Sequence, residues 1–374
     1  MLDVYEFHRP KPSCNVALLE PSDELRSFVF SSNLAAQDIT GDIATSCSAT
    51  TVLAALQGSY AQYSRIFGVF SVENNAVQDK HKDSMLNLPS TTDDSPSDVA
   101  GFPLAYVETE VYLAADTNVL AANIVLDAEL QPFEDEDLDE EAQQALTRCF
   151  DLLSETALEM RRPIIHVQLP YGKVATSAHN FCVNQLMQHG YRLAHEEIHG
   201  YVVMPLALER VENIHTECFE NSEFPDEIIP GILELLNQSN TDIPTGDLLR
   251  QPQPWTLQRL QQSATAHKKR GNRTLTTVLR DDSGCVLALS EALQRCHSSA
   301  DLAEQGITIV DCDHRNQGYG TRVKAAALKN IHNNWPKVKR VFSDYSSHNT
   351  RMGSINSRLG FQRVSATQIW QLTL

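Results

Sequence analysis

The sequence lacks the features that mark secreted, disulfide-stabilised or membrane-spanning proteins. Its eight cysteines are scattered over 374 residues without a C-x-x-C pair, which argues against a disulfide scaffold or a metal site. No apolar run approaches the roughly 18 residues that span a bilayer, and the N-terminus lacks the basic-then-apolar profile of a signal peptide. We therefore expect a cytoplasmic protein with reduced thiols, no metal and no membrane partner.

Positive charge is also scarce. Lys and Arg number 30 against 48 Asp and Glu, a formal charge of −18. A surface this negative repels phosphate backbones, so nucleic acid is not an expected partner. An anionic ligand would have to be held locally, by backbone N–H groups and a few cations. Glycine and proline, 16 of each, and 42% hydrophobic residues are typical of a globular protein.

The length favours two domains, at about 150 residues each. Residues 74–100 are rich in Asn, Asp, Ser, Thr and Pro, which predicts a mobile surface loop. A second polar stretch at 209–225 predicts the boundary, giving domains of 1–208 and 209–374. A weak internal repeat supports this division, because strand, helix, glycine-aromatic and strand follow one another around both Gly190 and Gly360. Duplication is favoured over chance similarity.

The C-terminal half has the hydrophobic spacing of a mixed α/β (α+β) sheet domain. The predicted elements are helices at 226–237, at 255–269 and from 318 onward, and strands at 273–280, 285–293 and 306–311.

One segment of this half carries chemistry. In Ile307–Lys324 a β-branched strand leads into Arg-x-x-Gly-x-Gly, formed by Arg315, Gly318 and Gly320, which opens an amphipathic helix. Glycine allows positive φ and a close approach of the backbone to a ligand. The free N–H groups at a helix start bind phosphate, and a cation such as Lys324 near that start makes sense if an anion lies in front of it. The motif alone is weak, since it also describes a structural glycine turn.

A second segment sharpens the assignment. A strand at 340–343 is followed by Asn-x-x-Met-x-x-x-Asn-x-x-Leu-Gly-Phe, which begins at Asn349. The whole order resembles the GNAT superfamily of acyl-CoA-dependent N-acyltransferases. Pro244–Leu248 is similar to a segment of its actinomycete-type tandem-GNAT acetyltransferases, and mycothiol synthase is the best-known enzyme with that two-domain architecture. The resemblance covers residues 225–374 well and the first half in outline.

The resemblance implies two tandem GNAT-like domains and transfer of an acetyl group from acetyl-CoA to a small-molecule primary amine by the C-terminal domain. Backbone N–H groups would hold the pyrophosphate, and strands that splay apart would admit the pantetheine arm as a pseudo-strand. The coenzyme-binding residues implied are Ile309, Val310, Asp311, Arg315, Asn316, Gln317, Gly318, Tyr319, Gly320, Thr321, Lys324, Asn349 and Met352. The alternatives are a CoA-binding regulatory pseudoenzyme and a mycothiol synthase-like enzyme; the acceptor amine and the oligomeric state are not indicated.

The proton carriers are less clearly marked. Many members of the superfamily have a general-acid Tyr where this chain has Asn356, which orients groups but cannot deliver a proton. Tyr345, expected in the loop before the last helix, is the nearest substitute, unless it only packs on the sheet. Glu291, in the middle of an apolar strand, is the candidate base, unless it points to solvent. Asp311 and Asp313 are alternative bases or only shape the turn.

The N-terminal half lacks the glycine motif. Seven of the eight residues from Glu134 to Glu141 are acidic, and none is glycine. Carboxylates at a helix start satisfy its dipole and repel a pyrophosphate, although an acidic helix start on a solvated surface has the same composition. Both interpretations predict a degenerate GNAT-like domain without a phosphate-binding loop.

Overall fold

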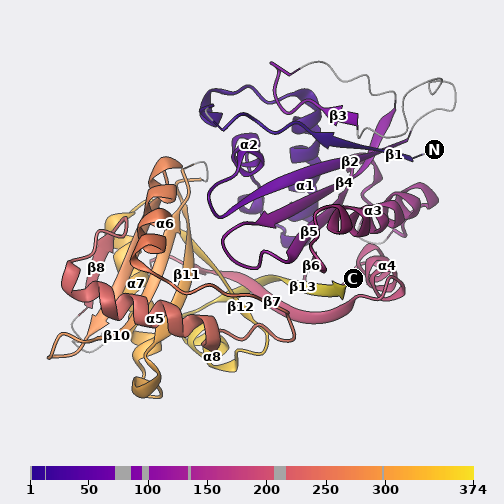
Figure 1. Cartoon of the computed structure of the whole chain (residues 1–374). Coiled ribbons are helices and arrows are strands. Elements are labelled where there is room, and N and C mark those ends of the chain that lie inside the picture. Colours follow the sequence, from indigo (N-terminus) through magenta and orange to yellow (C-terminus); the bar gives the residue numbers. More distant parts are fainter. Residues whose placement is uncertain are drawn as a thin grey trace. The chain divides into compact units, whose positions relative to one another are not determined.

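The chain forms two units, each built around strands and helices of its own (Figure 1). The computed structural model describes residues 2–12, 14–71, 86–94, 101–133, 136–205, 216–296 and 299–374. The first unit comprises Met1–Glu196, Asp247–Gln251 and Ser365–Leu374, and the second comprises Glu197–Gly246 and Pro252–Val364. The predicted boundary between residues 208 and 209 lies outside the described residues and stays a prediction.

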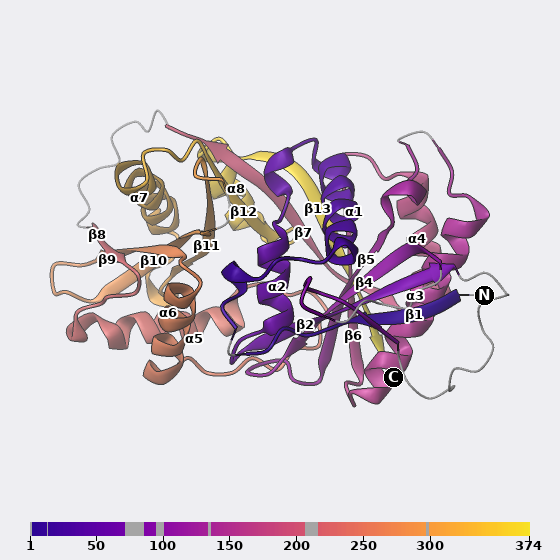
Figure 2. The ribbon, with the colours of Figure 1, turned by 90° about the horizontal axis from the view of Figure 1, so that it is seen from above.

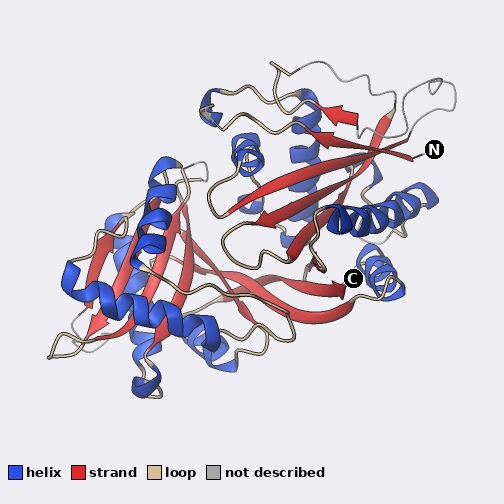
Figure 3. Ribbon diagram, viewed as in Figure 1, coloured by secondary structure: helices blue, strands red, loops and turns tan. Residues whose placement is uncertain are grey.

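Figure 3 shows helices and strands in both units. The helices are α1 (Asp23–Thr40), α2 (Ala49–Gln57), α3 (Glu140–Glu159), α4 (Ser177–Gln188), α5 (Ile229–Asp242), α6 (Leu257–Lys269), α7 (Tyr319–Asn334) and α8 (Thr350–Arg358). The strands are β1 (Leu2–Phe7), β2 (Gln62–Ser71), β3 (Leu86–Leu88), β4 (Phe102–Tyr112), β5 (Val119–Leu126), β6 (Ile164–Tyr171), β7 (Arg192–Val203), β8 (Thr216–Glu220), β9 (Arg273–Arg280), β10 (Val286–Gln294), β11 (Leu302–Val310), β12 (Arg340–Ser346) and β13 (Gln362–Thr373). No described helix is long and apolar enough to cross a membrane.

Side-chain caps fix where most of the helices begin. A Ser, Thr, Asp or Asn side chain accepts a hydrogen bond from a backbone N–H of the first turn, which satisfies a donor that has no partner inside the helix. The residues that do this are Ser22, Ser48, Asp139, Thr176, Thr256 and Asn349. Helix α5 instead follows directly on a 3-10 turn. Helix α7 has no such side-chain cap.

The sheet of the first unit is covered by helices on both faces (Figure 2). Its strand order is β3-β1-β2-β4-β5-β6-β13, in which β5 and β6 are parallel. Along β2 the side chains alternate, as expected for a strand buried on both sides. Phe67 and Val69 lie in the cluster with α3 and α4, whereas Ile66 lies in the cluster with α1 and α2.

The second unit repeats this arrangement. Its strand order is β7-β12-β11-β10-β9-β8, with β11 and β12 parallel and the other neighbours antiparallel. Helices α5 and α6 pack on one face with Leu289 and Ile309, and α7 packs on the other with Ala292 and Val341. The predicted mixed α/β architecture is confirmed. Strand β11 begins at Leu302, earlier than predicted, because its first residues pair with β12.

Part of the expected surface loop at 74–100 has regular structure. The described residues 86–94 include β3, which pairs in parallel with β1, and Leu88 is fully buried. The prediction of a loop throughout is therefore wrong for this part, because a strand of three residues is too short to give a recognisable pattern within a polar segment. The remainder, 72–85 and 95–100, lies outside the described residues.

The last strand of the chain completes the sheet of the first unit. Residues of β13 pair antiparallel with β6 from Ala366↔Tyr171 to Thr373↔Ile164. Trp370 is only 6% exposed and lies in the core cluster of α3. The amide oxygen of Gln371 lies 3.0 Å from His166 Nε2 and 2.7 Å from the N–H of Leu249. The stability of the first unit thus depends on residues encoded at the far end of the sequence.

Truncating Trp370 tests this dependence. We expect Trp370→Ala to lower the free energy of unfolding by about 3–5 kcal/mol, because it removes a large buried side chain and leaves a cavity. Chemical denaturation of the full chain, followed by circular dichroism, measures the change. Leu374→Ala is the control, because Leu374 is 47% exposed. Equal stability of the two variants would contradict the role given to β13.

Candidate active site

The candidate site lies where two parallel strands of the second unit separate. Strands β11 and β12 pair only from Leu302↔Arg340 to Glu304↔Phe342. Beyond this point β11 continues against β10, and β12 continues against β7. Residues 305–310 of β11 and 343–346 of β12, here called the fork, each therefore have one backbone edge without a recorded strand partner among the described residues. Such an edge can pair with an extended ligand.

A tight turn joins the fork to α7. Strand β11 ends in a 3-10 turn, Cys312–His314, in which Asp311 Oδ1 lies 2.7 Å from His314 Nδ1. Gln238 of α5 donates a hydrogen bond to the carbonyl of Val310 at 3.1 Å. The Asp311 carboxylate therefore shapes the turn, which is one of the two roles left open for it.

One group of side chains in this turn has metal-ligand spacing. Asp311, Cys312 and Asp313 offer ligand atoms within 4.8 Å of one another, and this is the one such group found in the described part of the chain. Asp311 is already bonded to His314, and the other two side chains are exposed. Exposed neighbouring acids are common without a metal, so we assign no metal site.

The start of α7 presents bare backbone N–H groups. Asn316 and Gly318 both have left-handed backbone conformations, with φ of 62° and 80°, and alternation of this kind forms an anion-binding concavity. Gly318 is the N-cap residue and has no side chain to cap the helix. The first backbone N–H of the helix with an intrahelical acceptor is that of Arg322, which donates to the carbonyl of Gly318 at 3.1 Å. In the described structure no acceptor is recorded for the N–H groups of residues 319–321.

Close helix packing also requires glycine here. A Cβ atom at Gly320 would lie 3.0 Å from Ile355 Cδ1 of α8 and 3.6 Å from Val310 Cγ2. The start of α7 is therefore pressed between α8 and the end of β11. A larger side chain at this position would push the helix start out of place.

Two of the predicted coenzyme ligands have side chains that are engaged elsewhere. The Arg315 guanidinium forms an ion pair with Asp242 at the end of α5. Asn349 caps α8, because its Oδ1 accepts a hydrogen bond from the N–H of Met352 at 3.0 Å. These side chains hold the walls of the site in position. Whether they also touch a ligand stays a prediction.

Lys324 and Asn356 are buried polar side chains beside the site. Lys324 is 2% exposed, and its Nζ lies 3.9 Å from the thioether sulfur of Met352. Burial lowers the pKa of Lys324 to about 8, and the charge of Asp344 opposes that shift. Asn356 is fully buried, and neither Oδ1 nor Nδ2 has a hydrogen-bond partner in the described structure.

Tyr345 does not lie in the loop predicted for it. Strand β12 continues to Ser346, and Tyr345 pairs there with Ile198 of β7. Its ring packs on Gly353 of α8 and edge-on against Phe361, with the ring centroids 5.6 Å apart. The strand is longer than predicted because its partner, β7, comes from the first half of the chain. A role for Tyr345 as general acid stays a prediction.

Glu291 lies in the middle of β10, opposite Thr276 of β9. Strand alternation puts its side chain on the face of Leu289, which α5 and α6 cover. The residue is half-buried, and burial raises the pKa of Glu291 to about 7. No hydrogen bond or ion pair is recorded for this carboxylate among the described residues.

Glu291, Gly306 and Asp344 lie on neighbouring strands and form a row that crosses the fork. The register places Gly306 of β11 beside Glu291, where a Cβ atom would meet only Glu291, at 3.9 Å. Two residues past the last β11–β12 pair lies Asp344, which is opposite His199 of β7. Burial lowers the pKa of His199, and the charge of Asp344 opposes this. His199 could not be predicted from local sequence, because its partner strand comes much later in the chain.

The first unit differs at the equivalent helix start. Strands β5 and β6 also pair in parallel before separating, from Val119↔Ile164 to Asn123↔Gln168. Helix α3 follows, but Asp139 caps it by accepting from the N–H of Ala142 at 2.7 Å. Further carboxylates fill its first turn. An anion placed here would meet negative charge instead of free N–H groups.

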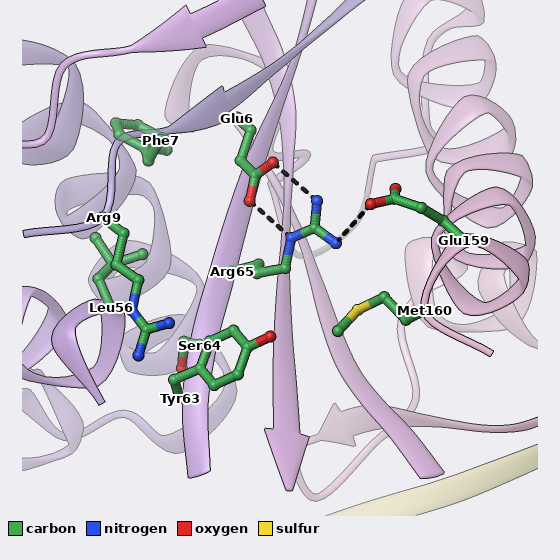
Figure 4. Close-up of a pocket in the computed structure, with 9 residues that line it drawn as sticks. All are labelled: Glu6, Phe7, Arg9, Leu56, Tyr63, Ser64, Arg65, Glu159 and Met160. Carbon is green, nitrogen blue, oxygen red and sulfur yellow. Dashed lines mark hydrogen bonds and ion pairs between the residues drawn. The ribbon is translucent and has the colours of Figure 1, made fainter. Parts of the chain in front are cut away.

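A separate pocket of about 410 Å³ lies in the first unit. Figure 4 shows the Arg65 guanidinium at its centre, bonded to both oxygens of Glu6 at 2.7 and 2.9 Å and 3.5 Å from Glu159. Arg9 lies over the ring of Tyr63 and donates to a backbone carbonyl. Because its central cation is already paired, this pocket offers a ligand little unbalanced charge.

Comparison with known proteins identifies the fold. No family model and no curated protein matches the sequence. A tandem GNAT protein from the clavulanic acid biosynthesis pathway, solved without AcCoA, aligns over 100% of this chain and 98% of its own, with 14% identity and a TM-score of 0.64. A GCN5-related N-acetyltransferase from Sphaerobacter thermophilus aligns over 100% of this chain and 95% of its own, with 14% identity and a TM-score of 0.59.

A third structure extends the likeness. It is a GCN5-related glucosamine N-acetyltransferase region of a fungal multi-domain GH3 β-N-acetylglucosaminidase, with 11% identity, a TM-score of 0.56 and coverage of 100% of this chain but 38% of the other. At these identities the likeness concerns the fold. The repeated sheet, the fork and the full-length alignments together show that this chain has the tandem GNAT fold.

Proposed function

We propose that the second unit binds acetyl-CoA and transfers its acetyl group to a small-molecule primary amine. The observation that carries this proposal is the start of α7, where bare N–H groups follow two left-handed residues directly after the fork. Such a helix start is a binding site for phosphate. Because the chain has a net charge of −18, a diphosphate needs a local site of this kind in order to bind.

The rest of the coenzyme suits the fork. The edge of β11 at Ile309–Asp311 has no recorded strand partner among the described residues, although Gln238 bonds the Val310 carbonyl. It would pair with the amide groups of the pantetheine arm as a further strand does, and this would direct the thioester toward the row of Glu291 and Asp344. Orientation of the two reactants accounts for much of the rate in a reaction of this kind. The acetyl thioester supplies the activated carbonyl group. The protein therefore has to supply groups that accept and donate protons.

Glu291 is the proposed base. An amine attacks a thioester only in its neutral form, so a carboxylate must first take its proton. Because the pKa of Glu291 is about 7, the group is ionised above that pH and still basic enough to accept a proton. Gly306 beside it has no side chain to block the approach of an amine, and a Cβ atom there would lie 3.9 Å from Glu291.

A second candidate function is a CoA-binding regulator without turnover. It is favoured by Asn356, which stands where many GNAT enzymes have a proton-donating Tyr. Release of free thiol from acetyl-CoA in the presence of a panel of primary amines separates the two functions. An enzyme releases thiol in proportion to added amine, whereas a regulator binds CoA and releases none.

The phosphate site can be tested by blocking the helix start. We expect Gly318→Val to weaken CoA binding at least about 100-fold, because a branched side chain would strain the left-handed backbone and cover the N–H groups that bind phosphate. Isothermal titration calorimetry with CoA measures the affinity.

Gly284→Val is the matched control. Gly284 also has a left-handed backbone, with φ of 90°, and lies in the same unit in the turn between β9 and β10. It should therefore cost similar strain and leave CoA affinity unchanged. Unaltered affinity in Gly318→Val would refute the phosphate site.

The base can be tested through the pH profile. For the wild type we expect the rate to rise as pH passes through about 7, where Glu291 loses its proton. Glu291→Gln should remove this rise and slow thiol release by about 10²–10⁴-fold. Glu304→Gln on the neighbouring strand, whose carboxylate pairs with Arg295, is the control and should behave as the wild type. A Glu291→Gln variant that keeps the rise would exclude Glu291 as the base.

A further inference from the structure

Lys324 occupies an unusual place for a lysine. Gly320, Lys324 and Leu328 follow one another at four-residue intervals on one face of α7, and this face packs on α8. Gly320 approaches Ile355, Lys324 reaches Met352, and Leu328 shares a core cluster with α8. The ammonium group is therefore enclosed between two helices, with 2% of the residue exposed.

No ion pair is recorded for this ammonium in the described part of the chain, and the charge of Asp344 acts on it without one. Its one recorded hydrogen-bond contact among the described residues is the Met352 sulfur at 3.9 Å, and a thioether is a weak acceptor. Asn356, one turn further along the same face of α8, is fully buried with both amide atoms unpartnered. Native proteins leave few buried polar groups without partners. Two such groups on facing helices therefore point to a polar ligand.

The position indicates which part of the ligand they meet. Lys324 lies just over one turn past the N–H groups proposed to hold the pyrophosphate. The charged group recorded to act on it is Asp344, on the β12 arm of the fork; Met352 and Asn356, which face it from α8, are uncharged. Lys324 is thus close along the helix to the anion site and within electrostatic reach of the fork. The part of the coenzyme that enters the fork and becomes anionic during transfer is its sulfur.

We infer that Lys324 is the proton donor to the sulfur of the departing coenzyme. This inference rests on the proposed function. As the amine nitrogen bonds to the acetyl carbon, the carbon–sulfur bond breaks and its electron pair stays on sulfur, while the nitrogen gives up its extra proton to solvent. A proton then moves from Lys324 Nζ to the sulfur, giving CoA thiol and a neutral lysine, which takes up a proton from solvent before the next turnover.

Burial suits Lys324 to this role. Its pKa of about 8 keeps it protonated at neutral pH, yet makes it a stronger acid than an exposed lysine. The rate should therefore fall as pH rises through about 8, whereas the ionisation of Glu291 makes it rise through about 7. The ring of Tyr345, the alternative donor, is packed against Gly353 and Phe361.

The direct test follows the thiol of bound CoA and needs no acceptor amine. An ammonium beside the sulfur stabilises the thiolate, so the thiol pKa of CoA bound to the wild type should lie below that of free CoA. Ultraviolet absorbance of the thiolate, titrated against pH, measures it. Lys324→Met, which replaces the ammonium by an apolar side chain of similar length, should raise the thiol pKa by about one unit or more. Lys329→Met, an exposed position of the same helix, should leave it unchanged.

Turnover and affinity complete the test. Lys324→Met should slow thiol release by about 10²–10⁴-fold and remove the fall in rate above pH 8, while CoA affinity stays within about threefold. Lys324→Gln should act in the same direction if the Met variant is poorly folded. An unchanged thiol pKa, or a loss of affinity with an unchanged rate at saturation, would overturn the inference. Failure of the wild type to bind CoA at all would instead overturn the proposed function, and this inference with it.

Discussion

Backbone hydrogen bonding is the constraint around which the second unit is organised. Buried N–H and C=O groups need partners, yet β11 and β12 stop pairing after Glu304 and Phe342, and α7 begins without a cap. The unpaired strand edge and the uncapped helix start lie at the two ends of one segment, which runs from the fork to the first turn of α7. In the described structure, the fork and the start of α7 thus bring backbone groups without recorded partners close together along the chain, where an extended anionic ligand would complete them.

The two units show that the fold alone does not create this site. Both contain a pair of parallel strands followed by a helix, but the helix of the first unit is capped by Asp139 and begins with acidic residues. The second unit has Gly318 at the same point and a buried lysine close behind it. The same backbone arrangement is thus closed to anions in one unit and open in the other, through a few residues at a helix start.

The sequence predicted what depends on local pattern. The mixed α/β architecture, the helix after Gly318 and the glycine turn follow from spacing and from the motif around Arg315. Other features depend on partners far away in the chain and could not be predicted. Tyr345 belongs to a strand because β7 pairs with it, β13 completes the first sheet, and Lys324 is buried because α8 covers it. The motif placed that lysine near an anion but gave no sign of its burial.

The proposed mechanism places coenzyme binding and both proton transfers in the second unit. In this mechanism, bare N–H groups would hold the coenzyme, Glu291 would take a proton from the amine, and Lys324 would give one to the sulfur. A crystal structure with acetyl-CoA tests this most directly. We expect the diphosphate against the N–H groups of residues 319–321 and the sulfur within hydrogen-bonding reach of Lys324 Nζ. A diphosphate bound elsewhere, with the start of α7 facing only solvent, would contradict it.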